Sequence, residues 1–218
     1  MEFKVLSIGG SILVQDTVDT DFIEKLIELL KTSDNKFILV VGGGKIARLL
    51  ATANPNLTND AKDRIGIATT RANAQLLIEN LIASGLDVNK TVLTDTDIEE
   101  GHNIYIMGGL TPGRTTDDVA TQMAIKHGAK TVINLSNIDG VYNKDPKLPD
   151  ANFLPKLSWD NFLSMFDTHA PGIHAPFDPV AAKRAKENGL QVIVANKDTD
   201  NLKKILDGSD EMLGTIIE

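Results

Sequence analysis

The chain has 218 residues, of which 42% are hydrophobic and 24% charged, as expected for a soluble globule with a sizeable core. Its formal net charge of −8 argues against nucleic-acid binding, which needs surplus Lys and Arg, and no apolar run reaches the roughly 18 to 20 residues of a membrane helix. The absence of cysteine excludes disulfides and thiolate metal sites. The lack of cysteine and of a secretion signal at the start together favour a cytoplasmic protein.

Short apolar runs alternate with longer amphipathic stretches along the chain. In order they predict strand 3–8, helix 20–33, strand 37–41, a helix ended by Pro55, helix 60–84, strand 103–107, helix 117–128, strand 130–136, helix 178–189, strand 190–195, helix 201–208 and strand 214–218. Strands rich in Val, Ile and Leu between helices predict an α/β fold, a three-layer αβα sandwich around a mostly parallel sheet. We expect one domain over residues 1–218, with 143–159 as its least regular stretch.

Four polar or glycine-rich turns follow predicted strands. They are IGGS (8–11), VGGGK (41–45), MGGLTPGRTTDD (107–118) and SNIDGVYNKDP (136–146). Ligands of open parallel sheets bind at the carboxyl ends of the strands, so we expect these turns to gather at one edge. Glycine lets backbone N–H groups face a phosphate, and three consecutive glycines at 42–44 are entropically costly. They predict that a ligand phosphate approaches the backbone there.

Two common nucleotide motifs fit this sequence poorly. A Walker A loop needs Ser or Thr after Gly-Lys, and Ile46 stands in that place. Gly42, Gly44 and Ala47 satisfy the dinucleotide pattern GxGxxA. The acidic residue at the matching distance, Asp63, lies within a helical pattern instead of ending a strand. A nicotinamide enzyme therefore remains a minor alternative.

Taken together, the four turns resemble the amino acid kinase superfamily, and within it the uridylate (UMP) kinases of archaeal type. The resemblance runs in order through IGGSIL (8–13), VVGGGKIAR (40–48), DRIGIATTRANAQLL (63–77), MGGLTPGRTTDDVA (107–120), NIDGVYNKDP (137–146), DPVAAKRA (178–185) and the closing GTIIE. It implies the amino acid kinase fold and Mg-ATP-dependent conversion of UMP to UDP in pyrimidine biosynthesis. Residues 1–129 would form the acceptor-nucleotide half and 130–218 the ATP half.

The resemblance also implies roles for individual residues. For UMP they are Gly42, Gly43, Arg48, Asp63, Thr111, Thr115 and Thr116, with Arg48 on the phosphate and Asp63 on the ribose hydroxyls. For ATP they are Gly9, Gly10, Gly44, Asn137, Gly140, Val141, Tyr142, Asp145 and Pro146. For catalysis they are Gly10 and Ser11 around the transferring group, Lys45, Lys183 at the γ-phosphate, and Asp117 and Asp178, which would orient the cations or hold Mg²⁺ indirectly. No residue is expected to bind the metal directly.

The sequence departs from the superfamily pattern K-x-G-G-S, because Ser7 stands where many members have lysine. Phosphoryl transfer depends on positioning and charge neutralisation, so a missing cation matters. We hypothesise that Lys45 supplies the ammonium group from the second turn. The acceptor is already a phosphate dianion, so direct in-line transfer requires neither a general base nor a covalent intermediate.

Several alternatives stay open on the sequence. The acceptor could be a carboxylate, a carbamate or isopentenyl phosphate, although the isoprenoid branch usually has a histidine after the second turn and GGGKIARLL has none. Ser7 also leaves room for a non-catalytic nucleotide sensor or oxyanion store. His169 and His174 suggest a metal site only weakly. The resemblance implies a homo-oligomer, commonly a hexamer built from dimers with helix 60–84 near the dimer contact, while the choice among UMP, dUMP and CMP stays undetermined.

Overall fold

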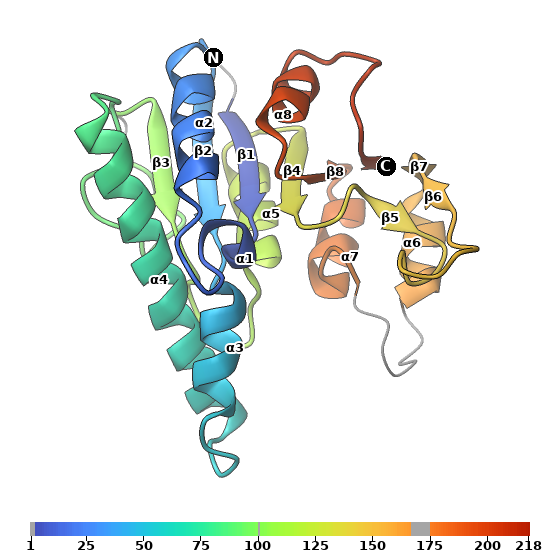
Figure 1. Ribbon diagram of the computed structural model, residues 1–218, viewed down its shortest axis with the longest axis horizontal. Helices are drawn as coiled ribbons and strands as arrows, with labels where there is room; N and C mark the ends of the chain where they lie inside the picture. The colour runs from blue at the N-terminus through green and yellow to red at the C-terminus, as the bar shows by residue number, and fades with distance from the viewer. Residues whose placement is uncertain (1–2, 100, 167–174) are drawn as a thin grey trace.

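A seven-stranded sheet forms the middle layer of the protein (Figure 1). We describe it from a computed structural model covering residues 3–99, 101–166 and 175–218. Across the described sheet the order is β3 (Ile104–Met107), β2 (Lys36–Val41), β1 (Phe3–Ile8), β4 (Thr131–Ser136), β8 (Gln191–Asn196), β9 (Thr215–Ile217) and β7 (Lys156–Leu157). The neighbours are parallel except β8 and β9, which run antiparallel. The predicted mostly parallel sheet is thereby confirmed.

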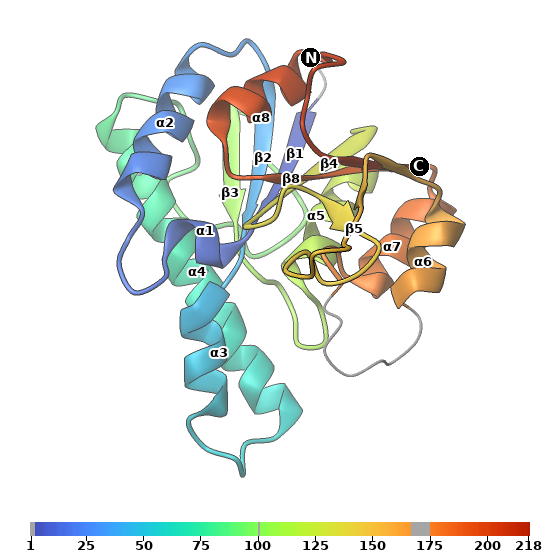
Figure 2. The same cartoon turned by 45° about the vertical axis from the view of Figure 1, so that its right-hand side comes forward.

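Helices cover both faces of this sheet. On one face lie α2 (Thr20–Lys31), α4 (Asn59–Ala83) and α8 (Thr199–Leu206), and α2 packs against α8 (Figure 2). On the other lie α5 (Thr116–Lys126), α6 (Trp159–Phe166) and α7 (Pro179–Glu187). Alternate strand residues face opposite layers, since Leu6 belongs to the first core cluster and Val5 to the second. The three-layer αβα expectation is therefore confirmed.

Side chains at the helix ends explain where the long helices begin. The Asp19 carboxylate accepts a hydrogen bond of 3.0 Å from the N–H of Phe22 and caps α2, one residue before the predicted start of the helix at residue 20. Thr58 caps α4 in the same way, through the N–H of Ala61 at 3.2 Å. Both caps satisfy a backbone donor that the first turn of a helix leaves unpaired.

Several short elements escaped the sequence analysis. They are α1 (Gly10–Leu13), the antiparallel pair β5 (Val141–Tyr142) and β6 (Phe153–Leu154), β7, and α6. Two-residue strands are too short to show a period of two, and their pairing partners are distant in the chain. The stretch expected to be irregular, 143–159, contains β6 and β7 and reaches the first residue of α6.

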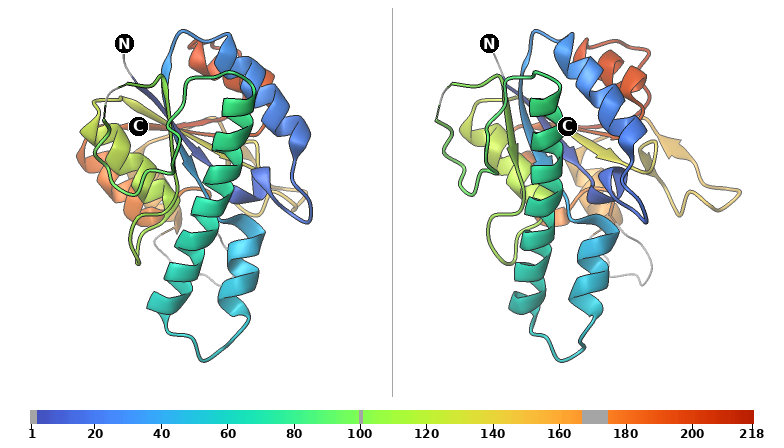
Figure 3. Two further views of the ribbon diagram at one scale, coloured as in Figure 1. Left: turned by 90° about the vertical axis from the view of Figure 1, so that its left-hand side faces the viewer. Right: turned by 60° about the vertical axis from the view of Figure 1, so that its left-hand side comes forward.

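The short helix α3 (Gly44–Thr52) and the first half of α4 project beyond the sheet (Figure 3). α3 packs against α4, yet none of its own residues is buried. Its Leu49 side chain is left 67% exposed. No described helix is long and apolar enough to cross a membrane.

Candidate active site

The carboxyl ends of β1, β2 and β4 lie side by side at one edge of the sheet. Ile8, the last residue of β1, pairs with Val41 of β2 and with Leu135 of β4. The turns that follow are joined to the same strands, since the N–H of Gly9 donates to the Leu135 carbonyl at 3.0 Å and that of Gly42 to the Ile8 carbonyl at 2.9 Å. The structure thus brings the glycine turns together, as their positions after the strands predicted.

The first two glycine turns touch each other through their main chains. A Cβ atom added to Gly10 would lie 2.2 Å from the Gly42 carbonyl oxygen, and one added to Gly44 would lie 2.5 Å from the Gly10 carbonyl carbon. Gly44 also has a φ of +63°, which favours glycine. The close approach expected at residues 42–44 is therefore made, at least at Gly42 and Gly44, by the first turn of the same chain.

A cavity of about 320 Å³ opens between the N-terminal ends of α3, α4 and α5. It is lined by Gly43, Ala47, Arg48, Ala51, Lys62, Asp63, Gly66, Ile67, Thr70, Gly109, Arg114, Thr115 and Thr116. Five of the seven residues predicted for the acceptor nucleotide are in this set. The other two lie outside this set. Gly42 packs against Gly10 of the first turn, and Thr111 is exposed in the loop after β3.

Polar contacts fix the side chains around this first cavity. Arg48 donates from Nη2 to the Ser11 hydroxyl at 3.2 Å, which links the second turn to the first. Asp63 accepts at Oδ2 a hydrogen bond of 2.7 Å from the N–H of Gly113. Thr115 caps α5 by accepting from the N–H of Asp118 at 3.2 Å. Three cations, Arg48, Lys62 and Arg114, thus line the cavity with the single carboxylate Asp63 among its lining residues.

A second cavity, of about 550 Å³, lies beside the turn that follows β4. Its lining includes all six residues that the sequence assigns to ATP in this turn: Asn137, Gly140, Val141, Tyr142, Asp145 and Pro146. The N–H of Val141 donates to the Thr215 hydroxyl at 2.7 Å, and Tyr142 packs edge-on against Phe153 at 5.5 Å. Contacts with β9 and β6 therefore hold this wall. Gly9, Gly10 and Gly44 belong to the turns after β1 and β2 and do not line it.

Asp117, in the first turn of α5, contacts both the end of β1 and the start of α7. Its Oδ1 accepts a hydrogen bond of 2.8 Å from the Ser7 hydroxyl, and its Oδ2 accepts one of 3.1 Å from the N–H of Asp178. Burial raises the pKa of this carboxyl from 3.8 to about 6, although the bonds from Ser7 and Asp178 oppose that rise. Ser7, at the lysine position of the pattern K-x-G-G-S, therefore serves as a neutral donor to Asp117.

The remaining predicted catalytic residues are spread around this centre. Asp178 caps α7, accepting at Oδ2 from the N–H of Ala181 at 3.0 Å, while Lys183 is exposed further along the same helix. Lys45 is the second residue of α3, and its ammonium group lies 2.6 Å from an oxygen of Asp16 at an exposed position. His169 and His174 lie outside the described residues. The site roles of Lys45, Lys183 and Asp178 remain predictions.

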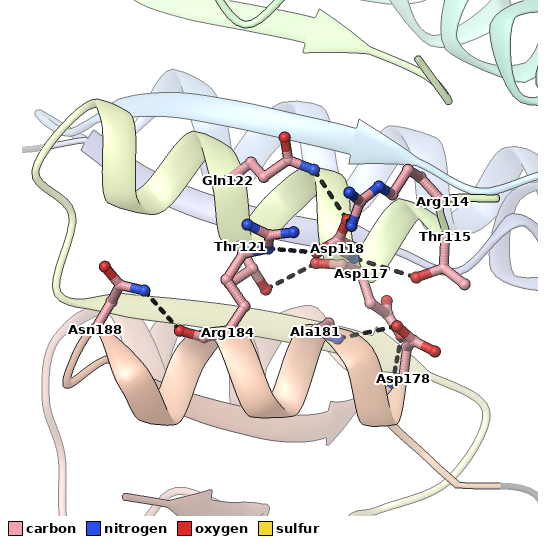
Figure 4. A network of polar contacts seen from close by, with 10 residues as sticks. All are labelled: Arg114, Thr115, Asp117, Asp118, Thr121, Gln122, Asp178, Ala181, Arg184 and Asn188. Atoms are coloured by element: carbon pink, nitrogen blue, oxygen red, sulfur yellow. Dashed lines mark hydrogen bonds and ion pairs between the residues drawn. The ribbon is translucent and has the colours of Figure 1, made fainter. Parts of the chain in front are cut away.

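Asp118 and its two arginines were missed by the sequence analysis (Figure 4). The Asp118 side chain is 1% exposed and accepts from Arg184 Nε at 2.7 Å, Arg114 Nη1 at 3.0 Å and Gln122 Nε2 at 2.9 Å. The only signal in the sequence was the second aspartate of GRTTDD. A first-turn aspartate is favourable on dipole grounds alone, so the pattern could not distinguish a surface residue from this buried one.

Comparisons with known proteins show which proteins this chain resembles. The family model described as the amino acid kinase family matches residues 2–196. A protein named uridylate kinase from Thermoplasma volcanium is 33% identical over 223 residues, covering 100% of this chain and 98% of that protein. The uridylate kinase of Pyrococcus abyssi is 37% identical over 228 residues, covering 98% of each. The crystal structure of uridylate kinase from Archaeoglobus fulgidus matches with a TM-score of 0.85 and 30% identity over 100% of both chains.

Proposed function

This chain belongs to the amino acid kinase family, and on that premise we propose that it transfers the terminal phosphoryl group of ATP to UMP, giving ADP and UDP for pyrimidine nucleotide biosynthesis. One observation carries the proposal. A cavity lined by three cations and one carboxylate lies at the strand ends of a protein whose net charge is −8, and a second, larger cavity lies beside the turn after β4. Local positive charge in an acidic chain suits a small anionic substrate.

We assign UMP to the smaller cavity and ATP to the larger one. Arg48 offers a planar, permanently charged group for the acceptor phosphate, which it can bind in a bidentate manner. Asp63 has one oxygen engaged with Gly113, and its other oxygen is assigned to the ribose hydroxyls. In this assignment residues 1–129 hold the acceptor and 130–218 supply most of the ATP site, as the resemblance implies.

Transfer proceeds in line between the two cavities, across the first glycine turn. The attacking oxygen belongs to a phosphate dianion, so the protein's task is to align the two nucleotides and to neutralise charge. Gly10 and Ser11 follow β1, the strand that lies between β2 and β4, and Arg48 donates to the Ser11 hydroxyl. We assign charge neutralisation to Lys45 and Lys183, from α3 and α7 respectively.

Mg²⁺ is expected to enter with ATP, shielding the charge on its phosphates. Both oxygens of Asp117 accept protein hydrogen bonds, and Asp178 caps α7. Such carboxylates suit an indirect role, through water or by orienting the lysines. They would still favour a cation nearby, because each adds negative charge at the junction of the two halves.

Two further properties are proposed for the whole protein. We expect a homo-oligomer, a hexamer of dimers by resemblance, because α3 projects beside α4 with its Leu49 side chain 67% exposed. A cytoplasmic address is proposed from the cysteine-free sequence.

The first test is ADP release from Mg-ATP with UMP, CMP, dUMP, AMP and isopentenyl phosphate as acceptors. We expect turnover with UMP, and we expect Arg48→Ala to raise its KM at least tenfold, as loss of a charge-assisted hydrogen bond predicts. Arg64→Ala is the matched control, an exposed arginine of α4 outside the cavity lining. ATP binding without turnover of any acceptor would contradict the kinase and favour a nucleotide sensor.

A further inference from the structure

Arg114 lines the acceptor cavity, and its guanidinium is also bound by Asp118. Its Nη1 donates to Asp118 Oδ2 at 3.0 Å, while the side chain remains 41% exposed and lines the cavity. A guanidinium has five N–H donors in a rigid fork, so one edge can bind Asp118 while the others stay available to a ligand. The arginine therefore needs no rearrangement to meet an anion in the cavity.

Asp118 is itself anchored independently of Arg114. Its Oδ1 accepts from Arg184 Nε at 2.7 Å, and its Oδ2 also accepts from Gln122 Nε2 at 2.9 Å (Figure 4). A buried carboxylate needs a positive partner, and Arg184 supplies one. The Asp118 charge is thus already balanced, so Arg114 adds a net positive charge to the acceptor cavity.

We infer that Arg114 is a second phosphate-binding arginine for the acceptor nucleotide, and that Asp118 and Arg184 position it. The inference rests on the proposed function and extends it. The acceptor phosphate is a dianion, and Arg48 alone would neutralise half of its charge. Arg114 immediately precedes Thr115 and Thr116, which also line the cavity at the N-terminus of α5, where the helix dipole favours an anion.

The test compares Arg114→Gln with Arg64→Gln. Both arginines pair with an aspartate four residues away along the chain, but Arg64 does not line the cavity. We expect Arg114→Gln to raise the KM for UMP and the calorimetric Kd for UMP without ATP by roughly tenfold or more, with the KM for ATP within about twofold. Arg64→Gln should change none of them. An unchanged Kd for UMP in a folded Arg114→Gln protein would overturn the inference.

A second variant tests the positioning role of Asp118. We expect Asp118→Asn to raise the KM for UMP, and the Arg114→Gln/Asp118→Asn double variant to match Arg114→Gln alone, because Asp118 acts through Arg114. Additive effects on the KM would mean that Asp118 has only a general structural role, and would overturn this part.

Calorimetry also separates this inference from the proposed function. If the wild type turns over UMP and Arg114→Gln binds UMP equally well, only the role of Arg114 is overturned. Wild-type protein that neither binds nor phosphorylates UMP removes the proposed function, and this inference with it.

Discussion

Ser7 removes a positive charge from the site, relative to a lysine at this position, and still gives Asp117 a hydrogen-bond donor. A lysine at this position would bring a positive charge, whereas the Ser7 hydroxyl brings only a hydrogen bond of 2.8 Å to Asp117. With neutral donors alone, burial prevails and the pKa of Asp117 is raised to about 6. A serine in place of a lysine therefore weakens the preference for an ionised carboxylate at Asp117.

This raised pKa predicts a pH dependence of stability. Between the unfolded value of 3.8 and about 6 the folded state binds more protons, so Asp117 makes the protein less stable as the pH rises through that window. Ser7→Ala removes the hydrogen bond that lowers the pKa of Asp117. The pKa should therefore rise further, and the loss of stability should continue above pH 6. We expect the difference in unfolding free energy between wild type and Ser7→Ala to grow from pH 4.5 to pH 7.5, reaching about 1.5–3 kcal/mol.

Urea denaturation at three pH values measures this difference. Asp117→Asn serves as the control, because without the titrating group the effect of Ser7→Ala should no longer change with pH. A difference that stays constant from pH 4.5 to pH 7.5 in the aspartate protein would contradict the account.

Among the residues, the resemblance anticipated much of the lining of the two cavities. That lining contains eleven of the sixteen residues assigned to UMP and ATP, including Arg48, Asp63 and Tyr142. The partner of Ser7 was not predictable, because Asp117 lies 110 positions away. Asp118 was missed for a similar reason, since its burial depends on Arg184, which lies on another helix.

Among the secondary-structure elements, α5 and α7 are joined by two consecutive residues. Asp117 accepts from the N–H of Asp178 at the start of α7, and Asp118 accepts from Arg184 further along it. Two contacts separated along a helix fix both its position and its rotation. The predicted catalytic residues of α7, Asp178 and Lys183, are thereby held relative to the acceptor cavity.

Arg184→Gln should loosen this attachment. Asp118 would keep Arg114 and Gln122, so we expect a loss of about 1–3 kcal/mol in unfolding free energy, below the cost of an isolated buried charge. Arg64→Gln breaks an exposed ion pair with Asp60 and should cost only about 0.3–0.5 kcal/mol. Chemical denaturation at pH 7.5 compares the two variants, and equal losses would show that the contact of Arg184 with Asp118 contributes little.

The long elements followed from sequence, whereas the short ones did not. Helix α4 was expected over 60–84 and spans Asn59–Ala83, because its length and the glycine after it are local signals. The strands β5, β6 and β7 have two residues each and depend on partners elsewhere in the chain. The antiparallel pairing of β9 with β8 was likewise not visible in the closing GTIIE.

For the molecule as a whole, the projecting pair α3 and α4 carries exposed apolar surface. Leu49 and Leu50 are 67% and 46% exposed, and none of the residues of α3 is fully buried. The proposed homo-oligomer would cover them. The three-layer architecture itself was predictable because strands and helices alternate regularly, but no local pattern gives the number of copies.

Leu49→Glu should therefore disrupt assembly. We expect wild-type protein to sediment as an oligomer and Leu49→Glu to shift to a smaller species, because a charge would be buried in an apolar contact. Leu213→Glu is the control, since Leu213 is also exposed but precedes β9, away from α3. Sedimentation velocity at micromolar concentration measures both. A monomeric wild type would remove the proposed assembly.

The contact between the first two glycine turns also limits how this protein can evolve. Gly10, Gly42 and Gly44 meet main chain to main chain, with a Cβ on Gly10 only 2.2 Å from the Gly42 carbonyl oxygen. A side-chain clash can be relieved by trimming the neighbour, but no codon encodes a smaller main chain. A genetic selection that starts from Gly10→Ala should therefore return true revertants at codon 10 and no suppressors at codons 42 or 44. A change in one turn therefore cannot be compensated in the other, although more than thirty residues separate them.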